Sequence, residues 1–576
     1  MPRAIALASN DVAFIVWQWD KKIPGCLGFA VFRQEDGASG WDPLPGWVGF
    51  KGQTNPDWKP QPTTVWPIQK FSWKDLTAVR GKTYRYKIVP VTGKPGTSTP
   101  LGLLDAQAVV TDAVALTPDR GSFKSYFNRG ILSTQFLARQ IPADASGVPD
   151  YKVLARRINQ PGDPLRNALA GQMLEGLELL LKRAATEGGR CYAALYELTD
   201  PELVALLLTS KNLSIILSNT GSNDAENKPA RQALHGQKGV TIIDRFVPSG
   251  HIGHNKFCVY ADKTGKAAAV LLGSTNWTNT AVCAQSNNAL VVENEEIATA
   301  YLDYWNRLKA DTGADGRGPQ GPALRKSNAV PGVNDVAIDS GETTVWFSPN
   351  TPKARSSAKN KKAEATPPDL ADVFALMDGA KEAIIFLEFQ PGKPSVIDHA
   401  AALQNAKPNL FVRGAATDPA AVGDFNTMLV HRYKAPVVEV VAASAIKDPF
   451  GVWQKELLKS SPGAHAIIHD KIVVIDPMTP DCVVVTGSHN QGFRASYNND
   501  ENLLIVRKHA GLAQAYAVHA MDIYDHYRFR YQLQQNGASA FTALTPDDSW
   551  QDKYFSPHDP AANDGAVWFP PGGVSS

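Results

Sequence analysis

The sequence predicts a mixed α/β protein in which a small all-β domain precedes two similar α/β lobes that share one site. Three observations predict this fold. Up to about residue 117 the chain consists of short β-branched and aromatic runs separated by turn residues. The chain beyond alternates buried, strand-like runs with helix-like runs. One motif occurs in both halves of that later region, and this repetition indicates an internal duplication.

The composition is that of a globular protein with several domains. The chain has 576 residues, too many for one core, with 43% hydrophobic and 20% charged residues. No apolar run reaches the length of a membrane span, and the N-terminus lacks the core and cleavage site of a signal peptide. We therefore expect a cytoplasmic protein, with secretion that needs no signal peptide as the alternative.

Net charge and cysteine content argue against two kinds of function, strong nucleic-acid binding and metal binding by cysteines. A net charge of +2 does not produce the strong positive electrostatic field that is typical of nucleic-acid-binding proteins. The five cysteines are scattered without CxxC spacing, so we expect reduced, buried thiols rather than disulfides or metal ligands.

The N-terminal domain is expected to span residues 1–117. Its strand-like runs cover residues 4–20, 28–34, 63–75 and 82–93. In the last run, alternation places Tyr84, Tyr86 and Ile88 on one face and Arg85 and Lys87 on the other. This pattern resembles the later strand of a fibronectin type III or immunoglobulin-like sandwich.

The first lobe is expected at residues 118–315. A helix-like apolar stripe at 125–141 and a helix at 168–185 come first. A strand at 191–198, a helix at 200–210 and strands at 212–219 and 240–246 lead to the first motif, and an amphipathic helix at 295–309 follows it.

The second lobe repeats this order. Residues 316–340 are rich in Gly, Pro and polar residues and are expected to be a linker. Lobe 2 is expected at 341–540, with helices at 369–380 and 396–406, strands at 382–389 and 409–416, and a closing helix at 509–535. Residues 541–576 are expected to form an irregular tail.

The repeated motif is His-x-Lys followed by Gly-Ser-x-Asn. Its two copies place the same residue types at matched spacing: His254, Lys256, Gly273, Ser274 and Asn276 in the first, and His469, Lys471, Gly487, Ser488 and Asn490 in the second. Eleven positions after each asparagine stands another polar residue, Asn287 (276 to 287) and Glu501 (490 to 501).

This pattern resembles the phospholipase D superfamily, whose signature is HxK, then Asp, then GSxN, in two copies that form one active site. The resemblance covers roughly residues 120 to 535. The second copy carries Asp476 at the family spacing, whereas the first has Ala261 there and Asp262 one residue late. The fold that the resemblance implies is two α/β lobes related by a pseudo-twofold axis.

The residue types suit phosphodiester cleavage through a covalent intermediate. Lys256, Lys471, Asn276 and Asn490 would donate to the phosphoryl oxygens, so no metal or other cofactor is expected. One histidine would attack phosphorus, and the other would protonate the leaving oxygen. In the superfamily, the polar residue after each GSxN orients the histidine of the other half. The resemblance thus puts Glu501 on His254, the favoured nucleophile, and Asn287, or the nearby Gln285, on His469, the favoured acid and base.

The remaining candidate residues have supporting roles. Ser274 and Ser488 are expected to donate hydrogen bonds in the site wall, and Asp476 to orient backbone at a strand end. Trp277 and Phe493 are expected to line the substrate channel, with core packing as the alternative.

The motif specifies a phosphodiester and leaves its substituents open. The first hypothesis is phospholipid hydrolysis or headgroup transfer at a membrane surface by a monomer. The second is a nuclease acting on DNA or RNA. The run at 353–369 carries five basic residues and is expected to be a solvated loop, with a guide for phosphate-rich substrates as the alternative that would favour the nuclease. The third is a non-catalytic binding protein with a degenerate site.

Overall fold

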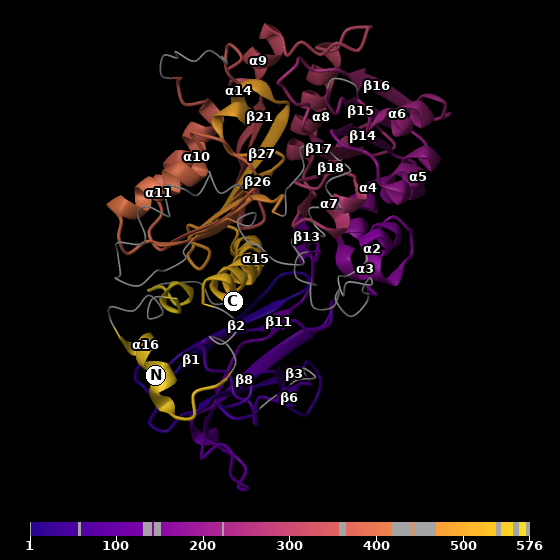
Figure 1. Ribbon diagram of the computed structural model, residues 1–576. Helices are drawn as coiled ribbons and strands as arrows, with labels where there is room; N and C mark the ends of the chain where they lie inside the picture. Colours follow the sequence, from indigo (N-terminus) through magenta and orange to yellow (C-terminus); the bar gives the residue numbers. More distant parts are fainter. Residues whose placement is uncertain are drawn as a thin grey trace.

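The computed structural model describes residues 2–53, 55, 59–130, 141–142, 151–221, 224–355, 364–417, 440–442, 468–536, 543–556 and 564–571. Within these residues the chain forms a β-rich N-terminal region and two α/β lobes (Figure 1). The predicted fold class is confirmed.

The N-terminal region packs two small sheets around an aromatic core. One sheet has the order β1-β2-β7, and the other is built on the antiparallel pair β3 and β8. In β8, Tyr84, Tyr86 and Ile88 enter the core between the sheets, and Arg85 is exposed, as the alternation predicts. The strands are β1 (Arg3–Ala8), β2 (Ala13–Gln18), β3 (Gly28–Glu35), β4 (Asp42–Pro43), β5 (Pro45–Gly46), β6 (Gln61–Pro62), β7 (Ser72–Asp75), β8 (Thr83–Thr92), β9 (Gly102–Leu103), β10 (Val109–Val110) and β11 (Val114–Ala115), with the short helix η1 (Asp105–Gln107).

Lobe 1 is organised around one mixed sheet. In the described residues its strand order is β12-β13-β19-β18-β17-β14-β15-β16. The strands are β12 (Asp119–Arg120), β13 (Phe123–Phe127), β14 (Arg190–Leu195), β15 (Leu213–Ser218), β16 (Val240–Arg245), β17 (Lys256–Ala261), β18 (Ala267–Gly273) and β19 (Asn288–Val292). The helical stripe predicted at 125–141 is wrong at its start, because Ser125 to Phe127 pair with β19. Residues 131–140 lie outside the described residues.

Lobe 2 repeats the same strand order. Its described sheet runs β20-β21-β27-β26-β25-β22-β23-β24, so each strand has a counterpart in lobe 1. The strands are β20 (Val333–Ile338), β21 (Gly341–Ser348), β22 (Ala383–Glu388), β23 (Phe411–Ala416), β24 (Val440–Ala442), β25 (Lys471–Ile475), β26 (Val483–Gly487) and β27 (Glu501–Arg507).

Helices cover both faces of each sheet. Helix α8 (Glu295–Ala310) lies on the inner face of the lobe 1 sheet and α15 (Ala510–Asn536) on that of lobe 2, each directly after its motif. The other described helices of the lobes are α2 (Tyr151–Ile158), α3 (Pro164–Ala170), α4 (Met173–Glu187), α5 (Pro201–Thr209), α6 (Lys228–His235), α7 (Asn279–Cys283), α9 (Pro322–Asn328), α10 (Pro368–Asp378), α11 (Val396–Ala406) and α14 (Phe493–Asn498).

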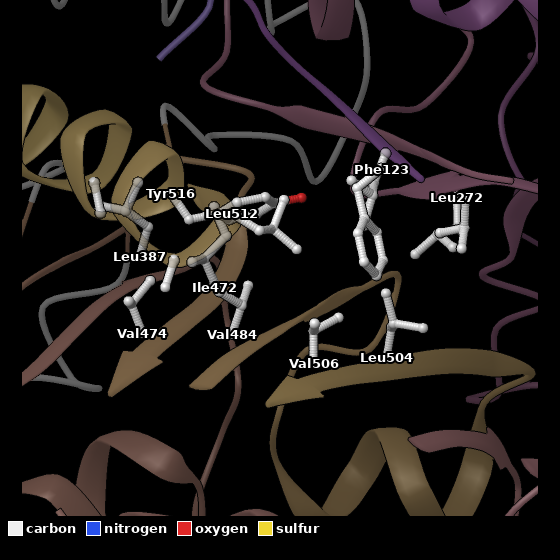
Figure 2. Packing of buried hydrophobic residues seen from close by; sticks show 14 of the residues in the cluster. Phe123, Leu272, Leu387, Ile472, Val474, Val484, Leu504, Val506, Leu512 and Tyr516 are labelled. Atoms are coloured by element: carbon white, nitrogen blue, oxygen red, sulfur yellow. The ribbon is translucent and has the colours of Figure 1, made fainter. Parts of the chain in front are cut away.

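One continuous core joins the parts. Figure 2 shows Phe123 and Leu272 from lobe 1 near Leu504 and Val506 from lobe 2, with Tyr516 of α15 beside the second sheet. The same cluster takes in Phe14 of the N-terminal region. The two histidine motifs therefore sit on sheets that are packed against each other rather than on independent domains.

Two predicted connecting segments are ordered parts of the fold. The linker predicted at 316–340 contains α9 and the edge strand β20, which pairs with β21 through a turn at Asp339. The predicted tail contains η5 (Asp548–Gln551), α16 (Asp552–Phe555) and η7 (Ala566–Trp568), and Trp550 enters the N-terminal core. Gly- and Pro-rich composition indicates turns, but it does not exclude short elements between them.

The five cysteines all lie in described residues, where each is buried and unpaired. The helices of the described residues include none that is both long and apolar enough to cross a membrane.

Candidate active site

The two motifs occupy equivalent places in the two sheets. Each histidine stands two residues before its lysine, which begins β17 in lobe 1 and β25 in lobe 2. The neighbouring strand, β18 or β26, ends at the motif glycine. Gly273 and Gly487 have φ of 142° and 141°, and a Cβ on either would come within 2.4 Å of a carbonyl oxygen of the adjacent strand. Only glycine fits this turn, which brings the following Ser and Asn into the site.

The histidines of the two motifs meet at the seam between the lobes. The ring centroids of His254 and His469 are 6.4 Å apart, and the residues are only 3% and 4% exposed. Each backbone is held by the opposite lobe, since His254 N donates to Asp500 O (2.9 Å) and His469 N donates to Ser286 O (3.0 Å). The site therefore exists only when both lobes are in place.

The Nδ1 partners of the histidines differ. His254 Nδ1 lies 2.9 and 3.0 Å from the carboxylate oxygens of Glu501, and His469 Nδ1 lies 2.9 Å from Asn287 Oδ1. Both contacts cross the seam. An acceptor at Nδ1 fixes the tautomer that carries its proton there, and a carboxylate also stabilises positive charge on the ring.

The motif serines hold these acceptors in place. Ser488 Oγ donates to Glu501 Oε2 (2.8 Å), and Ser274 Oγ donates to Asn287 Oδ1 (2.9 Å). Asn499 Nδ2 adds a hydrogen bond to Glu501 Oε1 (3.0 Å). Each serine thus acts on the histidine of the opposite lobe through that histidine's partner.

The two lysines are buried beside the histidines. Lys256 Nζ donates to His254 O and Lys471 Nζ to His469 O, both at 2.6 Å. Burial lowers the pKa of Lys256 to about 7 and that of Lys471 to about 8, against the opposing effect of the Glu501 carboxylate. The ammonium groups carry further donors that these backbone contacts do not use.

Burial also shifts the pKa values of the histidines and of Glu501. It lowers the pKa of His254 and of His469 well below the ordinary value, and the two lysines lower both further. Burial raises the pKa of Glu501 to about 7, opposed by Lys256. Without an anion in the site, both imidazoles are therefore neutral near pH 7.

The two motif asparagines follow equivalent turns, three residues after the glycines that end β18 and β26. Asn276 Nδ2 donates to Glu197 Oε2 at 2.5 Å, and the Oδ1 atoms of Asn276 and Asn490 have no partner among the described residues. Buried amides with unused hydrogen-bonding capacity are suited to contact a polar ligand.

Asp476 serves the fold next to the site. Its carboxylate accepts hydrogen bonds from the backbone N–H groups of Lys381, Glu382 and Ala383, at 2.9, 2.8 and 2.7 Å. These bonds fasten the end of β25 to the start of β22. Asp262, its nearest equivalent in lobe 1, caps a turn through Thr264 and Lys266.

The two aromatic candidates are buried. Trp277 is 1% exposed and belongs to the core on the outer face of the lobe 1 sheet, which favours the packing alternative. Phe493 begins α14, is 5% exposed and stacks on Tyr497 with a centroid distance of 6.2 Å.

Three residues that contact the site were missed from the sequence. Tyr196 lies beside His254 (5.2 Å between centroids), with Lys256 Nζ 5.3 Å from its ring centroid. Phe389 occupies the same place near His469 and Lys471, at 4.9 and 5.0 Å. The third is Glu197. The available signal was that an aromatic residue and a carboxylate are adjacent in the sequence at the end of β14 and again at the end of β22, the strands that pair with β17 and β25.

The charged groups of the site are lysines and isolated carboxylates. In the part of the chain that the structure describes, no three His, Cys, Asp or Glu side chains form a cluster that could hold a metal ion. The positive groups that act on the two histidines are the ammonium groups of Lys256 and Lys471, which lower the pKa of both imidazoles.

Comparison with known proteins adds a family match. Residues 181–309, which contain the whole first motif, match the family model described as "Cardiolipin synthase, PLD-like domain". No curated protein matches the chain.

Solved structures give only distant similarities. Phosphatidylserine synthase of Haemophilus influenzae is 12% identical, with a TM-score of 0.39, over 64% of this chain and 89% of that one. Nuc of Salmonella typhimurium, a phospholipase D family member, is 18% identical, with a TM-score of 0.22, over 32% and 95%. Polyphosphate kinase of Porphyromonas gingivalis is 13% identical, with a TM-score of 0.31, over 57% and 45%.

The family match covers the lobe that carries the first motif, and the second lobe repeats its strand order and its HxK and GSxN residues. Residues 181–309 are therefore similar to a phospholipase D-like domain, and the second lobe carries a second copy of the same motif residues.

Proposed function

We propose that the protein is a phosphodiesterase that works through a phosphohistidine at His254. The observation that carries this proposal is the pair of imidazoles 6.4 Å apart with different Nδ1 partners, Glu501 on His254 and Asn287 on His469. A carboxylate partner stabilises the positive charge that develops on an imidazole when it attacks phosphorus. A neutral amide partner leaves His469 able to give up and regain a proton.

In the first step, the Nε2 lone pair of His254 attacks phosphorus, and the bond from phosphorus to the leaving oxygen breaks. His469 Nε2–H gives its proton to that oxygen. Burial lowers the pKa of His469, but a bound phosphate anion stabilises the imidazolium and raises this pKa again. Lys256, Lys471, Asn276 and Asn490 donate to the non-bridging oxygens throughout.

In the second step, His469 removes a proton from water or an alcohol, and the resulting oxygen attacks phosphorus. The P–N bond breaks, and its electron pair returns to His254 Nε2. Water as acceptor gives hydrolysis, and an alcohol gives transfer of the phosphoryl substituent. None of these steps calls on a metal ion.

We favour a phospholipid as the substrate. The net charge of +2 and the lack of a global basic excess argue against a protein that tracks a nucleic-acid backbone. The basic run that favours a nuclease lies largely outside the described residues. Of its described members, Arg355 pairs with Glu364 (2.6 Å), which offsets its charge.

The experiment compares the two substrate classes directly. Purified protein with EDTA is incubated with phosphatidylcholine vesicles, and separately with plasmid and single-stranded DNA. We expect choline release without DNA nicking. Nicking without choline release would favour the nuclease, and neither activity would favour a non-catalytic role.

Variants and trapping test the mechanism. His254→Ala and His469→Ala should each abolish turnover, whereas His235→Ala, which removes a half-exposed histidine bound to Asp244, should not. A substrate labelled at phosphorus, quenched during turnover, should leave acid-labile label on His254. Label on His469 would reverse the roles of the two histidines.

A further inference from the structure

Glu197 is a carboxylate in the site to which the proposed mechanism gives no role. Strand β14 runs antiparallel to β17 and ends with Leu195 opposite Lys256. Two residues later, Glu197 Oε2 accepts the hydrogen bond from Asn276 Nδ2 at 2.5 Å. Glu197 is partly buried.

The backbone around Glu197 is held rigidly. Trp277 N donates to Glu197 O at 3.0 Å, which ties the residue to the GSxN turn. The buried side chain of Asn227 binds the peptide on both sides, donating to Tyr196 O (2.6 Å) and accepting from Leu198 N (2.9 Å). The contact with Asn276 is therefore built into the fold.

The charged groups that face Glu197 come from three elements. They are Lys256 on β17, Lys471 on β25, and Glu226 in the turn before α6. Burial raises the pKa of Glu197 to about 7, with Lys256 as the main opposing influence. Above pH 7 the carboxylate is mainly ionised, and it adds one negative charge to the site over the same pH range in which Lys256 loses its positive charge.

The second lobe has no matching charge. Leu195 lies opposite Lys256 and Glu388 lies opposite Lys471, so the counterpart of Glu197 is the exposed, neutral Gln390. Glu388 itself is buried without a hydrogen-bond partner among the described residues. Burial raises the pKa of its carboxyl group well above the ordinary value, with Lys471 as the main opposing influence. Glu197 thus breaks the twofold symmetry of the phosphate site.

A negative charge at this place discriminates between phosphates of different charge. A phosphodiester carries one negative charge, whereas the monoester left by its hydrolysis carries nearly two above pH 7. Repulsion between two negative charges grows with their product, and at a partly buried carboxylate it is screened less than in open water.

We propose that Glu197 orients the Asn276 amide towards the phosphoryl group and, by its charge, makes the site prefer a singly charged phosphodiester to a doubly charged monoester. This inference rests on the proposed function. It gives Glu197 a role in releasing the product of hydrolysis, which gains the second charge only after cleavage.

The charge effect is tested by binding, without turnover. The affinities of dimethyl phosphate, a monoanion, and of inorganic sulfate, a dianion, are measured calorimetrically at pH 8. In Glu197→Gln the ratio of sulfate affinity to dimethyl phosphate affinity should rise roughly tenfold over the wild type, as expected for one charge at about 10 Å in partly screened surroundings. An unchanged ratio would overturn the inference.

A matched control uses the neighbouring carboxylate. Glu226→Gln removes the same charge from a residue that makes no described contact with Asn276, and its effect on the ratio should be clearly smaller. An equal effect would show that the Glu197–Asn276 contact is not the basis of selection. Should the Gln variant fail to fold, Glu197→Ala gives the same charge test.

The orienting role is tested separately. Gln at position 197 keeps an oxygen for Asn276 Nδ2, and Leu does not. Glu197→Leu should therefore lower the rate of phosphohistidine formation several-fold more than Glu197→Gln, and equal rates would contradict the role. A protein that never traps label on His254 would refute the proposed function, whereas label on His254 with an unchanged binding ratio would refute only the inference on Glu197.

Discussion

At the scale of single residues, the site obtains two chemical roles from two copies of one motif. His254 and His469 share the same strand position, the same lysine at i+2 and the same backbone contact. The two histidines differ in the partner of Nδ1, which is Glu501 for His254 and Asn287 for His469. A charge difference of one unit next to buried imidazoles is enough to separate a nucleophile from an acid.

The first prediction concerns that carboxylate. Glu501→Gln keeps an oxygen acceptor for His254 Nδ1 but removes the charge. We expect the rate of phosphohistidine formation to fall about 10²–10⁴-fold, measured by rapid quench with labelled substrate. Glu293→Gln, which removes a partly exposed carboxylate paired with Arg183, is the control and should leave the rate unchanged. A full rate in Glu501→Gln would remove the basis for the role assignment.

The second prediction concerns pH. Glu501 has its pKa raised to about 7, so it loses its charge as the pH falls below 7. Lys256 has its pKa lowered to about 7, so it loses its charge as the pH rises above 7, and Lys471 follows near 8. We therefore expect a bell-shaped profile of kcat/KM with its maximum near pH 7. Arginine stays charged at alkaline pH, so in Lys256→Arg the alkaline side of the kcat/KM profile should shift to higher pH. An unshifted alkaline side would exclude Lys256 as the group responsible.

At the scale of elements, the strands that carry the motifs are fixed by different means in the two lobes. In lobe 2, Asp476 with φ of 47° turns the chain and accepts three backbone N–H groups from the start of β22. In lobe 1, Ala261 stands at the corresponding place, and the next residue, Asp262, only caps an exposed turn. The acidic residue of the second motif, Asp476, therefore stabilises the contact between the end of β25 and the start of β22.

The third prediction follows from this fastening. Asp476→Ala leaves three N–H groups without their acceptor and should lower the free energy of unfolding by about 3 kcal/mol. Asp262→Ala, the matched change in lobe 1, should cost less than about 1 kcal/mol because its partners are exposed to water. Chemical denaturation followed by tryptophan fluorescence measures both, and equal costs would contradict the distinction.

At the scale of the whole molecule, the two lobes are joined by pairs of related contacts across the seam. Asn288 Nδ2 donates to Thr486 Oγ1 (2.8 Å), and Asn502 Nδ2 donates to Asn255 Oδ1 (3.0 Å). The C-terminal segment returns to the N-terminal region, where Trp550 packs on Phe29 and Phe71 and donates to Cys26 O (2.9 Å). Figure 1 shows this return, with α16 beside the N-terminal sheets.

The fourth prediction tests the packing of the C-terminal segment against the N-terminal region. Trp550→Ala should destabilise the protein by about 3–5 kcal/mol, since it removes a buried indole and leaves a cavity in the N-terminal core. Trp41→Ala, which removes a less buried indole from the second small core, should cost less. Thermal unfolding measured by near-ultraviolet circular dichroism compares them, and an unaffected Trp550 variant would show that the C-terminal segment contributes no stability.

The sequence by itself determined the fold class, the duplication and the identity of the motif residues. Strand and helix periodicities are local, and the spacing within each motif is preserved because each copy must form the same strand, turn and strand. The same locality explains the errors. Residues 316–340 have the composition of a linker, and the pairing of β20 with β21 depends on neighbours that composition does not reveal.

Only the tertiary structure decided the electrostatics of the site. The resemblance implied the contacts of Glu501 with His254 and of Asn287 with His469, which join residues 247 and 182 positions apart. It did not give the burial that shifts the pKa values of these groups. The place of Glu197 on Asn276, and the burial that moves its pKa to about 7, likewise depend on how β14 lies beside β17. Charge interactions depend on distance and burial in space, and neither is encoded in the order of residues within a motif.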